Sequence, residues 1–399
     1  MIKMPEEIHT LAHGKVLWLG GYSILEKPNI GYVTTVDAGV HAYFQKRESS
    51  LVSISVPQFE QNAEGTIDSS TGDIKIETTK ELLLVKTTIK VASSYAAALG
   101  YSLSGFSLRT LNDPAFSYRV GTGTAKLSKS GLGSSAAVTV AVADAIFKAF
   151  GVSKSENDAL HKIAQISHSL ATGKIGSGFD IAAATYGDIV YSRYSPEFIE
   201  SIPMNFSGTD IAEAVKKKWD YQISPLPLPK AFSFSMANFV DDAAITTKMV
   251  GSVKEFKRIH ESEYSKLITD MNEQNKTAID ALRIIQKDSE DEDALSSFRD
   301  AFNKGRQLSK ELGIESKVPI EPDDITDLIQ GTVKNGAFVA KSPGAGGYDA
   351  IVALFRSVDG DVNQNRVSKF WEQTGKLQPL EVGPSKLNHE QNRKKKLAV

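Results

Sequence analysis

The feature that most constrains this chain is a glycine- and serine-rich loop, Ser-Gly-Leu-Gly-Ser-Ser-Ala-Ala at 130–137, which leads into an apolar segment rich in alanine and valine. Gly131 and Gly133 have no Cβ, so the backbone can curl there and bring its N–H groups close to an anion. Ser134 and Ser135 can cap the helix that follows or turn their hydroxyls toward a metal ion. The sequence therefore predicts a phosphate-binding loop at the positive end of a buried helix.

Two well-known phosphate-binding motifs do not match this loop. No lysine follows its second glycine, as a P-loop requires, and it lacks the third glycine of the dinucleotide-binding loop. A cluster of glycine and serine before a helix can also be no more than a cap and a tight turn. The loop by itself leaves two interpretations open, a phosphate-binding loop of another fold and a simple helix start.

The bulk composition narrows the class of protein. The chain has 399 residues, enough for two domains that each bury a core, and its 41% apolar and 24% charged content is typical of globular proteins. A net charge of −2 argues against a nucleic-acid partner or an acidic membrane surface. The absence of cysteine excludes disulfides, thiolate catalysis and cysteine-ligated metals. We read no signal peptide and no apolar run of about 18 residues, so we expect a cytoplasmic protein without a membrane partner.

Apolar periodicity predicts a mixture of strands and helices along the chain. β-branched or alternating segments predict strands at 15–20, 31–44, 50–56, 103–111, 187–194 and 231–239, with an exposed hairpin within 59–79. Strong helix formers predict helices at 81–99, 136–150, 155–172, 251–287 and 291–312. Gly151 is a stop signal for the second of these helices. The stretch 195–230, with three closely spaced prolines, predicts the connection between domains, and the acidic run 288–293 predicts a solvated helix start.

Glycine-rich turns recur along the chain, at 14–22, 131–135 and 342–347, with a smaller one at 174–180. Each is weak evidence alone, but together they predict a polyphosphate pocket built from several loops. Phosphoryl transfer needs backbone N–H groups and cations around the phosphoryl group, Mg²⁺ and a positioned acceptor. The cations nearest these turns are Lys15, Lys129, Lys174, Arg193 and Lys341, and the best-placed carboxylate is Asp180. Taken singly, each lysine can also be a surface charge and Asp180 a helix cap.

Four segments resemble the GHMP small-molecule kinase superfamily and, within it, the phosphomevalonate kinases of the eukaryotic type. They are His-Gly-Lys-Val-Leu-Trp-Leu-Gly-Gly-Tyr-Ser-Ile-Leu-Glu at 13–26, 129–137, 171–187 and Ser-Pro-Gly-Ala-Gly-Gly-Tyr-Asp at 342–349. The resemblance implies an α+β fold with a ribosomal-protein-S5-like, ATP-binding N-terminal domain at 1–204 and a ferredoxin-like C-terminal domain at 205–399. It implies ATP and Mg²⁺ as cofactors, 5-phosphomevalonate as substrate, and a monomer or homodimer.

The resemblance also assigns roles to individual residues. Lys15 and Asp180 would be catalytic, at the transferring phosphoryl group. ATP would be bound by the loop and its preceding lysine, Lys129, Ser130, Gly131, Leu132, Gly133, Ser134, Ser135 and Ala136, with Ser135, or else Ser134, near Mg²⁺. The acceptor would be bound by Gly21, Tyr22, Ser23, Lys174, Ser177, Gly178, Arg193, Ser342, Gly344, Ala345, Gly346 and Gly347. Lys129 and Arg193 are also implied as ligands of the acceptor's phosphate.

The chain departs from the family pattern at three places. His13 stands where the first motif usually has proline, and Leu127 stands where many superfamily members have proline before the Gly-Leu loop. Mevalonate kinases carry a Mg²⁺-binding glutamate upstream of the aspartate turn, but this chain has Ser-His-Ser at 167–169. The protein ligands of the metal therefore need not be those of mevalonate kinases.

The acceptor's chemistry sets what Asp180 has to do. An alcohol benefits from a general base, whereas a phosphate monoester is mostly dianionic at pH 7 because its second pKa is about 6. We expect Asp180 mainly to orient Lys15 and the acceptor, and Lys15 to offset the repulsion between two anions. The alternatives are mevalonate kinase or another GHMP kinase, a diphosphomevalonate decarboxylase, and a non-catalytic ligand sensor.

Overall fold

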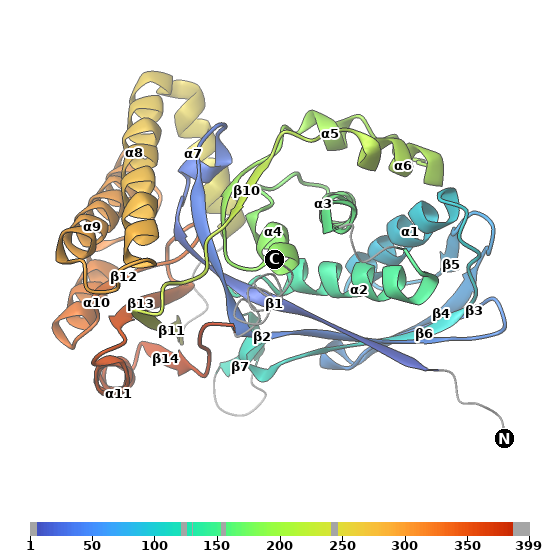
Figure 1. Ribbon diagram of the computed structural model, residues 1–399, viewed down its shortest axis with the longest axis horizontal. Coiled ribbons are helices and arrows are strands. Elements are labelled where there is room, and N and C mark those ends of the chain that lie inside the picture. The colour runs from blue at the N-terminus through green and yellow to red at the C-terminus, as the bar shows by residue number, and fades with distance from the viewer. Residues whose placement is uncertain (1–5, 121–125, 130, 153–156, 241–245, 386–399) are drawn as a thin grey trace.

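The computed structural model describes residues 6–120, 126–129, 131–152, 157–240 and 246–385. Figure 1 shows two units side by side: a broad sheet overlaid by helices, and a smaller sheet flanked by long helices. The change from the first sheet to the second falls between Pro225 and Phe232, inside the stretch predicted to connect the domains.

The first unit is built on an eight-stranded sheet in the order β10-β9-β2-β6-β3-β4-β5, with β1 also paired to β2. Its strands are β1 (Glu7–Leu19), β2 (Gly31–Lys46), β3 (Leu51–Val56), β4 (Gln61–Ile67), β5 (Ile74–Ile76), β6 (Phe106–Asn112), β9 (Ile189–Ser192) and β10 (Gln222–Pro225). The pairs are antiparallel except β3 with β6, which is parallel. Strands β1 and β2 are long, so they extend from the first unit to the second and carry the glycine turn after Leu19 toward it.

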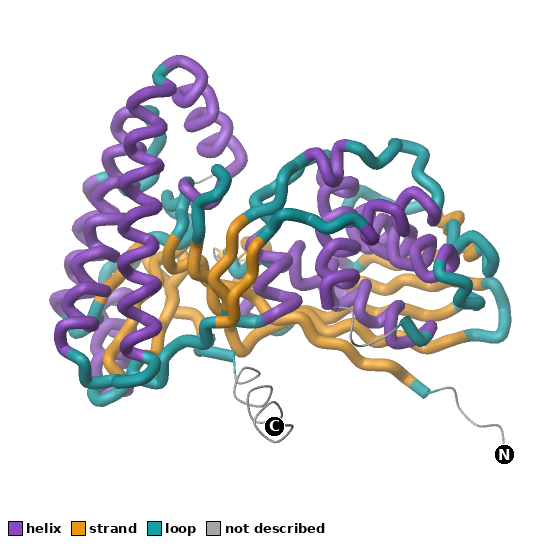
Figure 2. Tube along the Cα trace, turned by 45° about the horizontal axis from the view of Figure 1, so that its top comes forward, coloured by secondary structure: helices purple, strands orange, loops and turns teal. Residues whose placement is uncertain are grey.

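Helices cover one face of this sheet, as Figures 1 and 2 show from two directions. They are α1 (Leu83–Ala98), α2 (Ser134–Phe150), α3 (Asn157–Thr172) and α4 (Phe179–Tyr186), with α5 (Glu197–Glu200) and α6 (Gly208–Lys216) outside them. Helix α2 is buried along most of its length because its small alanines let it lie directly on β1 and β2. The first unit also has the short 3₁₀ helices η1 (Ser23–Leu25), η2 (Pro57–Phe59) and η3 (Pro114–Phe116). Strands β7 (Ser117–Val120) and β8 (Lys126–Lys129) form a separate antiparallel pair.

The second unit contains a four-stranded antiparallel sheet in the order β12-β13-β11-β14. These strands are β11 (Phe232–Phe239), β12 (Val339–Lys341), β13 (Ala350–Arg356) and β14 (Leu377–Leu380). Its helices are α7 (Thr246–Ile259), α8 (Glu261–Ile285), α9 (Glu292–Glu315), α10 (Asp323–Lys334) and α11 (Gly360–Gln373). Helices α8 and α9 form a long antiparallel pair that rises beside the turn after β1.

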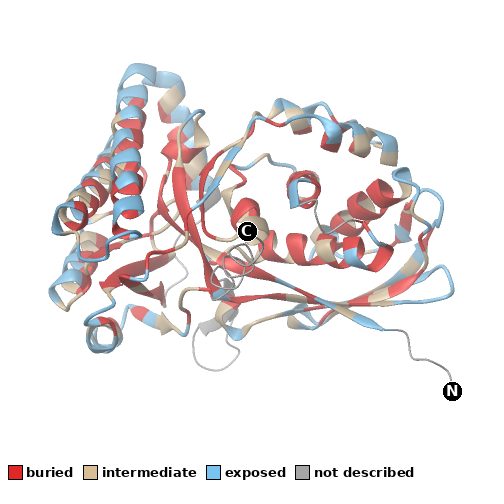
Figure 3. Cartoon of the chain, in the orientation of Figure 1, coloured by how far each residue is buried: buried red, intermediate tan, exposed pale blue. Residues whose placement is uncertain are grey.

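One hydrophobic cluster contains buried side chains of both units, and Figure 3 shows buried residues, in red, in both sheets. The ring of Trp18 on β1 meets Phe234 on β11 edge to face, with centroids 5.5 Å apart. Polar contacts hold the turn after β1 in place: Asn275 on α8 accepts from the Gly20 N–H at 3.2 Å and donates to the Ser23 hydroxyl at 2.9 Å. The two units are therefore packed against each other.

Most predicted strands and helices are confirmed, with differences at particular places. The predicted helix 251–287 is instead two helices that meet at His260. Ser134 and Ser135 do not cap α2, because Gly133 occupies the N-cap position. Gly151 ends α2 as predicted, and Asp291 caps α9 by accepting from the Ala294 N–H. The boundary at 204 stays a prediction, although α6 and β10, which follow it, both pack on the first unit. Within the described residues, every helix is too short or too polar to cross a membrane.

Candidate active site

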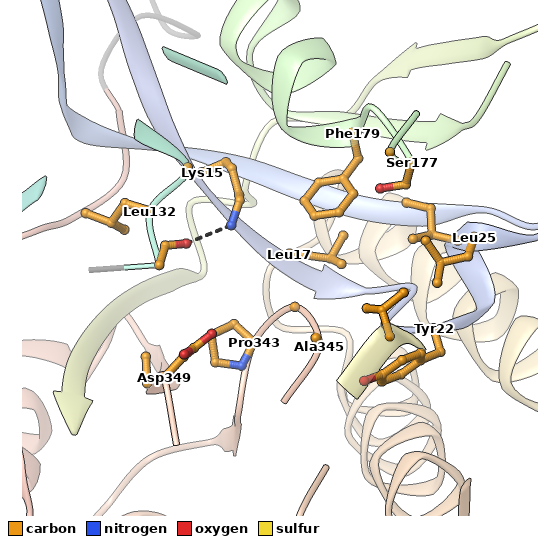
Figure 4. Close-up of a pocket in the computed structure, with 18 of the residues that line it drawn as sticks. Lys15, Leu17, Tyr22, Leu25, Leu132, Ser177, Phe179, Pro343, Ala345 and Asp349 are labelled. Carbon is orange, nitrogen blue, oxygen red and sulfur yellow. Dashed lines mark hydrogen bonds between the residues drawn. The ribbon is translucent and has the colours of Figure 1, made fainter. Parts of the chain in front are cut away.

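A cavity of about 490 Å³ lies where the glycine-rich turns of both units meet. Its walls come from the segments 15–25, 131–135, 176–179 and 343–350, with Val250 of α7. Figure 4 shows apolar side chains, among them Leu17, Leu25 and Phe179, on one side and Lys15 with Asp349 on the other. A volume in this range suits a nucleotide-sized ligand, and the arrangement separates an apolar part from a charged part.

The loop at 131–135 presents the N-terminus of α2 to this cavity, because Ser134 and Ser135, the first residues of the helix, both line it. Gly133 has φ +82°, a left-handed conformation that glycine adopts without strain. A Cβ at Gly133 would lie 3.2 Å from Lys15 Cε. The glycine is therefore needed both for the turn and for the close approach of the lysine, and the helix terminus supplies N–H groups to an anion.

Lys15 on β1 points into the cavity, where its ammonium group donates to the Gly131 carbonyl at 2.8 Å. Its backbone N–H donates to the Leu132 carbonyl at 3.0 Å, so the strand and the loop are tied together twice. Burial lowers the pKa of Lys15, while the nearby carboxylates of Asp180 and Asp349 act in the opposite direction. The result is a partly desolvated cation, which acts more strongly on an anionic ligand than a lysine in bulk water would.

The turn before Asp180 is held by a buried polar network. The Gln165 amide donates to the Gly178 carbonyl at 2.8 Å, and the Tyr194 hydroxyl donates to Gln165 Oε1 at 3.2 Å. Gly178 has φ +80°, and a Cβ there would come within 2.6 Å of the Gln165 amide, so any other residue would strain the backbone and displace that amide. Burial lowers the pKa of the adjoining His161 to about 3, which keeps this ring neutral. Asp180, in the first turn of α4, is thus presented on a rigid support.

One further polar contact reaches the loop from α3. His168 Nε2 lies 3.2 Å from Ser135 Oγ, and both residues are half-buried. No group of three or more histidine, aspartate or glutamate side chains within the described ranges is arranged to hold a metal ion by itself. A metal ion in this cavity would therefore need other oxygen ligands, such as hydroxyls, water or the oxygens of a bound phosphate.

Comparisons with known proteins agree with this geometry. The family described as "GHMP kinases N terminal domain" matches residues 86–188, and "GHMP kinases C terminal" matches residues 292–376. The phosphomevalonate kinase of Candida albicans is 30% identical over 91% of this chain and 91% of its own length. The peroxisomal phosphomevalonate kinase of Arabidopsis thaliana is 28% identical over 86% of this chain and 88% of its own length.

This chain belongs to the GHMP kinase family. Solved structures support the fold assignment: the phosphomevalonate kinase of Streptococcus pneumoniae, in complex with phosphomevalonate and AMPPNP, superposes with a TM-score of 0.73 at 20% identity. The match covers 94% of this chain and 99% of the pneumococcal one. The predicted α+β, two-domain GHMP kinase fold is thereby confirmed.

The GHMP kinase cavity brings together many of the residues that the sequence predicted. Those that line it are Lys15, Gly21, Tyr22, Gly131, Leu132, Gly133, Ser134, Ser135, Ser177, Gly344 and Ala345. Asp180 lies just behind the wall, with its Cβ 3.8 Å from where a Gly133 Cβ would stand. The side chain of Lys129 and the whole of Ser130 fall outside the described residues.

The remaining predicted residues lie around the cavity, not among its lining residues. They are Ser23, Ala136, Lys174, Gly178, Arg193, Ser342, Gly346 and Gly347. Arg193 donates to the Leu25 carbonyl at 2.7 Å and to the Gly176 carbonyl at 3.2 Å, so it joins two lining turns, and Lys174 is exposed. Their predicted contact with substrate stays a prediction.

Sequence reasoning did not single out several residues that shape the GHMP kinase site. Asp349 is the charged residue among them. The sequence could have indicated it, because an aspartate directly follows the Gly-Ala-Gly-Gly-Tyr turn. Phe179 faces Lys15, with its ring centroid 5.6 Å from the ammonium nitrogen. Leu17, Ile24 and Val250 had no signal that separates them from ordinary core residues.

Proposed function

We propose that this chain transfers the γ-phosphoryl group of ATP to the phosphate of 5-phosphomevalonate, which yields 5-diphosphomevalonate and ADP. This is a step of the mevalonate pathway of isoprenoid synthesis. The proposal rests on Lys15, a cation held by the Gly131 carbonyl at the glycine loop, with the carboxylates of Asp180 and Asp349 in its surroundings. It also draws on full-length relatives that are named phosphomevalonate kinases.

In this proposal the loop 131–136 holds the phosphates of ATP. Its N–H groups and the N-terminus of α2 supply partial positive charge to the phosphates. The transferred phosphoryl group lies next to Lys15, whose ammonium position is set by the Gly131 carbonyl. A cation fixed at this point can orient the phosphoryl group for transfer.

The acceptor makes charge the main difficulty. A phosphate monoester is mostly dianionic near pH 7, so attack on ATP brings two anions together. Lys15, partly desolvated, lowers this repulsion at the point of contact. Asp180 keeps Lys15 oriented and does not need to remove a proton, because the attacking oxygen is already ionised. In the phosphorylation of an alcohol, by contrast, the acceptor benefits from a general base.

The proposal includes Mg²⁺, for which Ser135 is the candidate protein ligand. Mg²⁺ takes oxygen ligands and is usually held by one or two protein groups together with substrate phosphates. Ser135 offers a hydroxyl at the cavity wall, and oxygens of the bound phosphates and water would complete the ligand set. When bound, the ion would neutralise charge on the phosphates. The cytoplasmic location and the monomeric or homodimeric state stay predictions.

The experiment is an ADP-release assay on the purified protein with ATP and Mg²⁺, comparing 5-phosphomevalonate with mevalonate. We expect turnover with the phosphorylated acceptor and little with the alcohol. Preference for mevalonate would replace the proposal by a mevalonate kinase. ADP release with loss of CO₂ from diphosphomevalonate would favour a decarboxylase, and nucleotide binding without turnover of any acceptor would favour a sensor.

A further inference from the structure

We propose that His168 is a positioning residue that directs the Ser135 hydroxyl toward a Mg²⁺ ion bound with ATP. This inference rests on the proposed function, because Ser135 is the hydroxyl expected to contact the metal. Its basis in the structure is the 3.2 Å contact between His168 Nε2 and Ser135 Oγ at the rim of the cavity.

A serine hydroxyl that gives a lone pair to a cation must send its proton away from that cation. In a helix the usual acceptor is the carbonyl four residues earlier. For Ser135 that carbonyl belongs to Gly131, which lies before the start of α2 in a left-handed conformation (φ +65°) and so outside the helical geometry that this bond needs. His168 Nε2 is an alternative acceptor when the ring carries its proton on Nδ1. The imidazole then turns the free lone pairs of Ser135 into the cavity.

The surrounding backbone holds both partners at this separation. The Thr139 hydroxyl donates to the Ser135 carbonyl at 2.8 Å, and the Thr172 hydroxyl donates to the His168 carbonyl at 2.8 Å. Helices α2 and α3 pack against each other, so the contact bridges two rigid elements. An imidazole, unlike a carboxylate, also adds no negative charge beside two phosphate-bearing substrates.

The test measures metal binding directly, by calorimetric titration of Mg²⁺ into the full-length protein saturated with AMPPNP. His168→Leu removes the acceptor, and His168→Gln replaces it with an amide oxygen. We expect His168→Leu to weaken Mg²⁺ binding by about 10- to 100-fold, the usual effect of losing a group that orients a metal ligand. His168→Gln should recover much of this loss, and His260→Leu, which removes an exposed histidine of the second unit, should behave like the wild type.

A double-mutant cycle distinguishes positioning from simple packing. If His168 acts through Ser135, the Ser135→Ala/His168→Leu protein should bind Mg²⁺ no more weakly than Ser135→Ala alone. Independent, multiplying losses would overturn the proposal. So would a His168→Leu protein that melts at a lower temperature but binds Mg²⁺ normally. A wild-type protein that binds Mg²⁺ with AMPPNP but does not turn over 5-phosphomevalonate would refute the proposed function alone.

Discussion

The replacement of Gly133 by alanine tests how the glycine loop and the lysine depend on each other. Gly133 has φ +82°, and the new Cβ would stand 3.2 Å from Lys15 Cε and 3.5 Å from Lys15 Cγ. The 3.2 Å contact is tighter than ordinary van der Waals packing, so the lysine has to shift by a few tenths of an ångström. We expect two separate consequences, one for stability and one for catalysis.

The stability effect comes from the backbone. A left-handed conformation costs a residue with a Cβ about 1–2 kcal/mol relative to glycine. Gly100→Ala is the matched control, because Gly100 has φ +89° at the end of α1 and a Cβ there would meet nothing within 4 Å. Both variants should lose a similar free energy of unfolding, measured by urea denaturation.

The catalytic effect should appear in Gly133→Ala alone. Displacing Lys15 loosens its 2.8 Å bond to the Gly131 carbonyl and moves the ammonium group from the transferring phosphoryl group. A misplacement of about 1 Å can cost on the order of 100-fold in rate. A shift of a few tenths of an ångström should therefore lower kcat in the ADP-release assay by about 3- to 10-fold. Equal kcat values for the Gly133→Ala and Gly100→Ala proteins would refute the reasoning.

Two further predictions concern charge. Lys15→Ala should lower kcat by about 10²–10³-fold through loss of transition-state stabilisation. Asp180→Asn should lower kcat by well under about 10²-fold, because no general base is needed. Equal, near-total losses of kcat in both variants would contradict the assigned roles. Burial lowers the pKa of Lys341 from 10.5 to about 8, so the folded protein binds fewer protons than the unfolded chain between these values. The free energy of unfolding of the wild type, relative to that of Lys341→Met, should therefore rise with pH across this window by at most about 3 kcal/mol. Urea denaturation at pH 7.5 and 9.5 measures this difference, and the same difference at both pH values would argue against the prediction.

The local sequence predicted those parts of the site that short-range geometry controls. Gly131 and Gly133 of the loop and Gly178 of the turn before Asp180 adopt positive φ angles, which only glycine accepts freely, so these turns could be predicted from residue type. The apolar run after the loop and the Gly151 stop defined α2 in the same way. Helix propensity alone missed the break at His260, where the chain leaves the helical conformation between two strongly helical segments.

What the sequence by itself determined is the set of parts: glycine turns able to approach a phosphate, a lysine and an aspartate beside them, and a helix to hold the loop. Only the tertiary structure decided which parts face the cavity, because that depends on contacts between residues far apart in the chain. It placed Asp349 beside Lys15 and His168 beside Ser135, and it used Arg193 to join two turns. Pairings of this kind depend on how α3, β9 and the second sheet pack against β1, and no local pattern of residues encodes that packing.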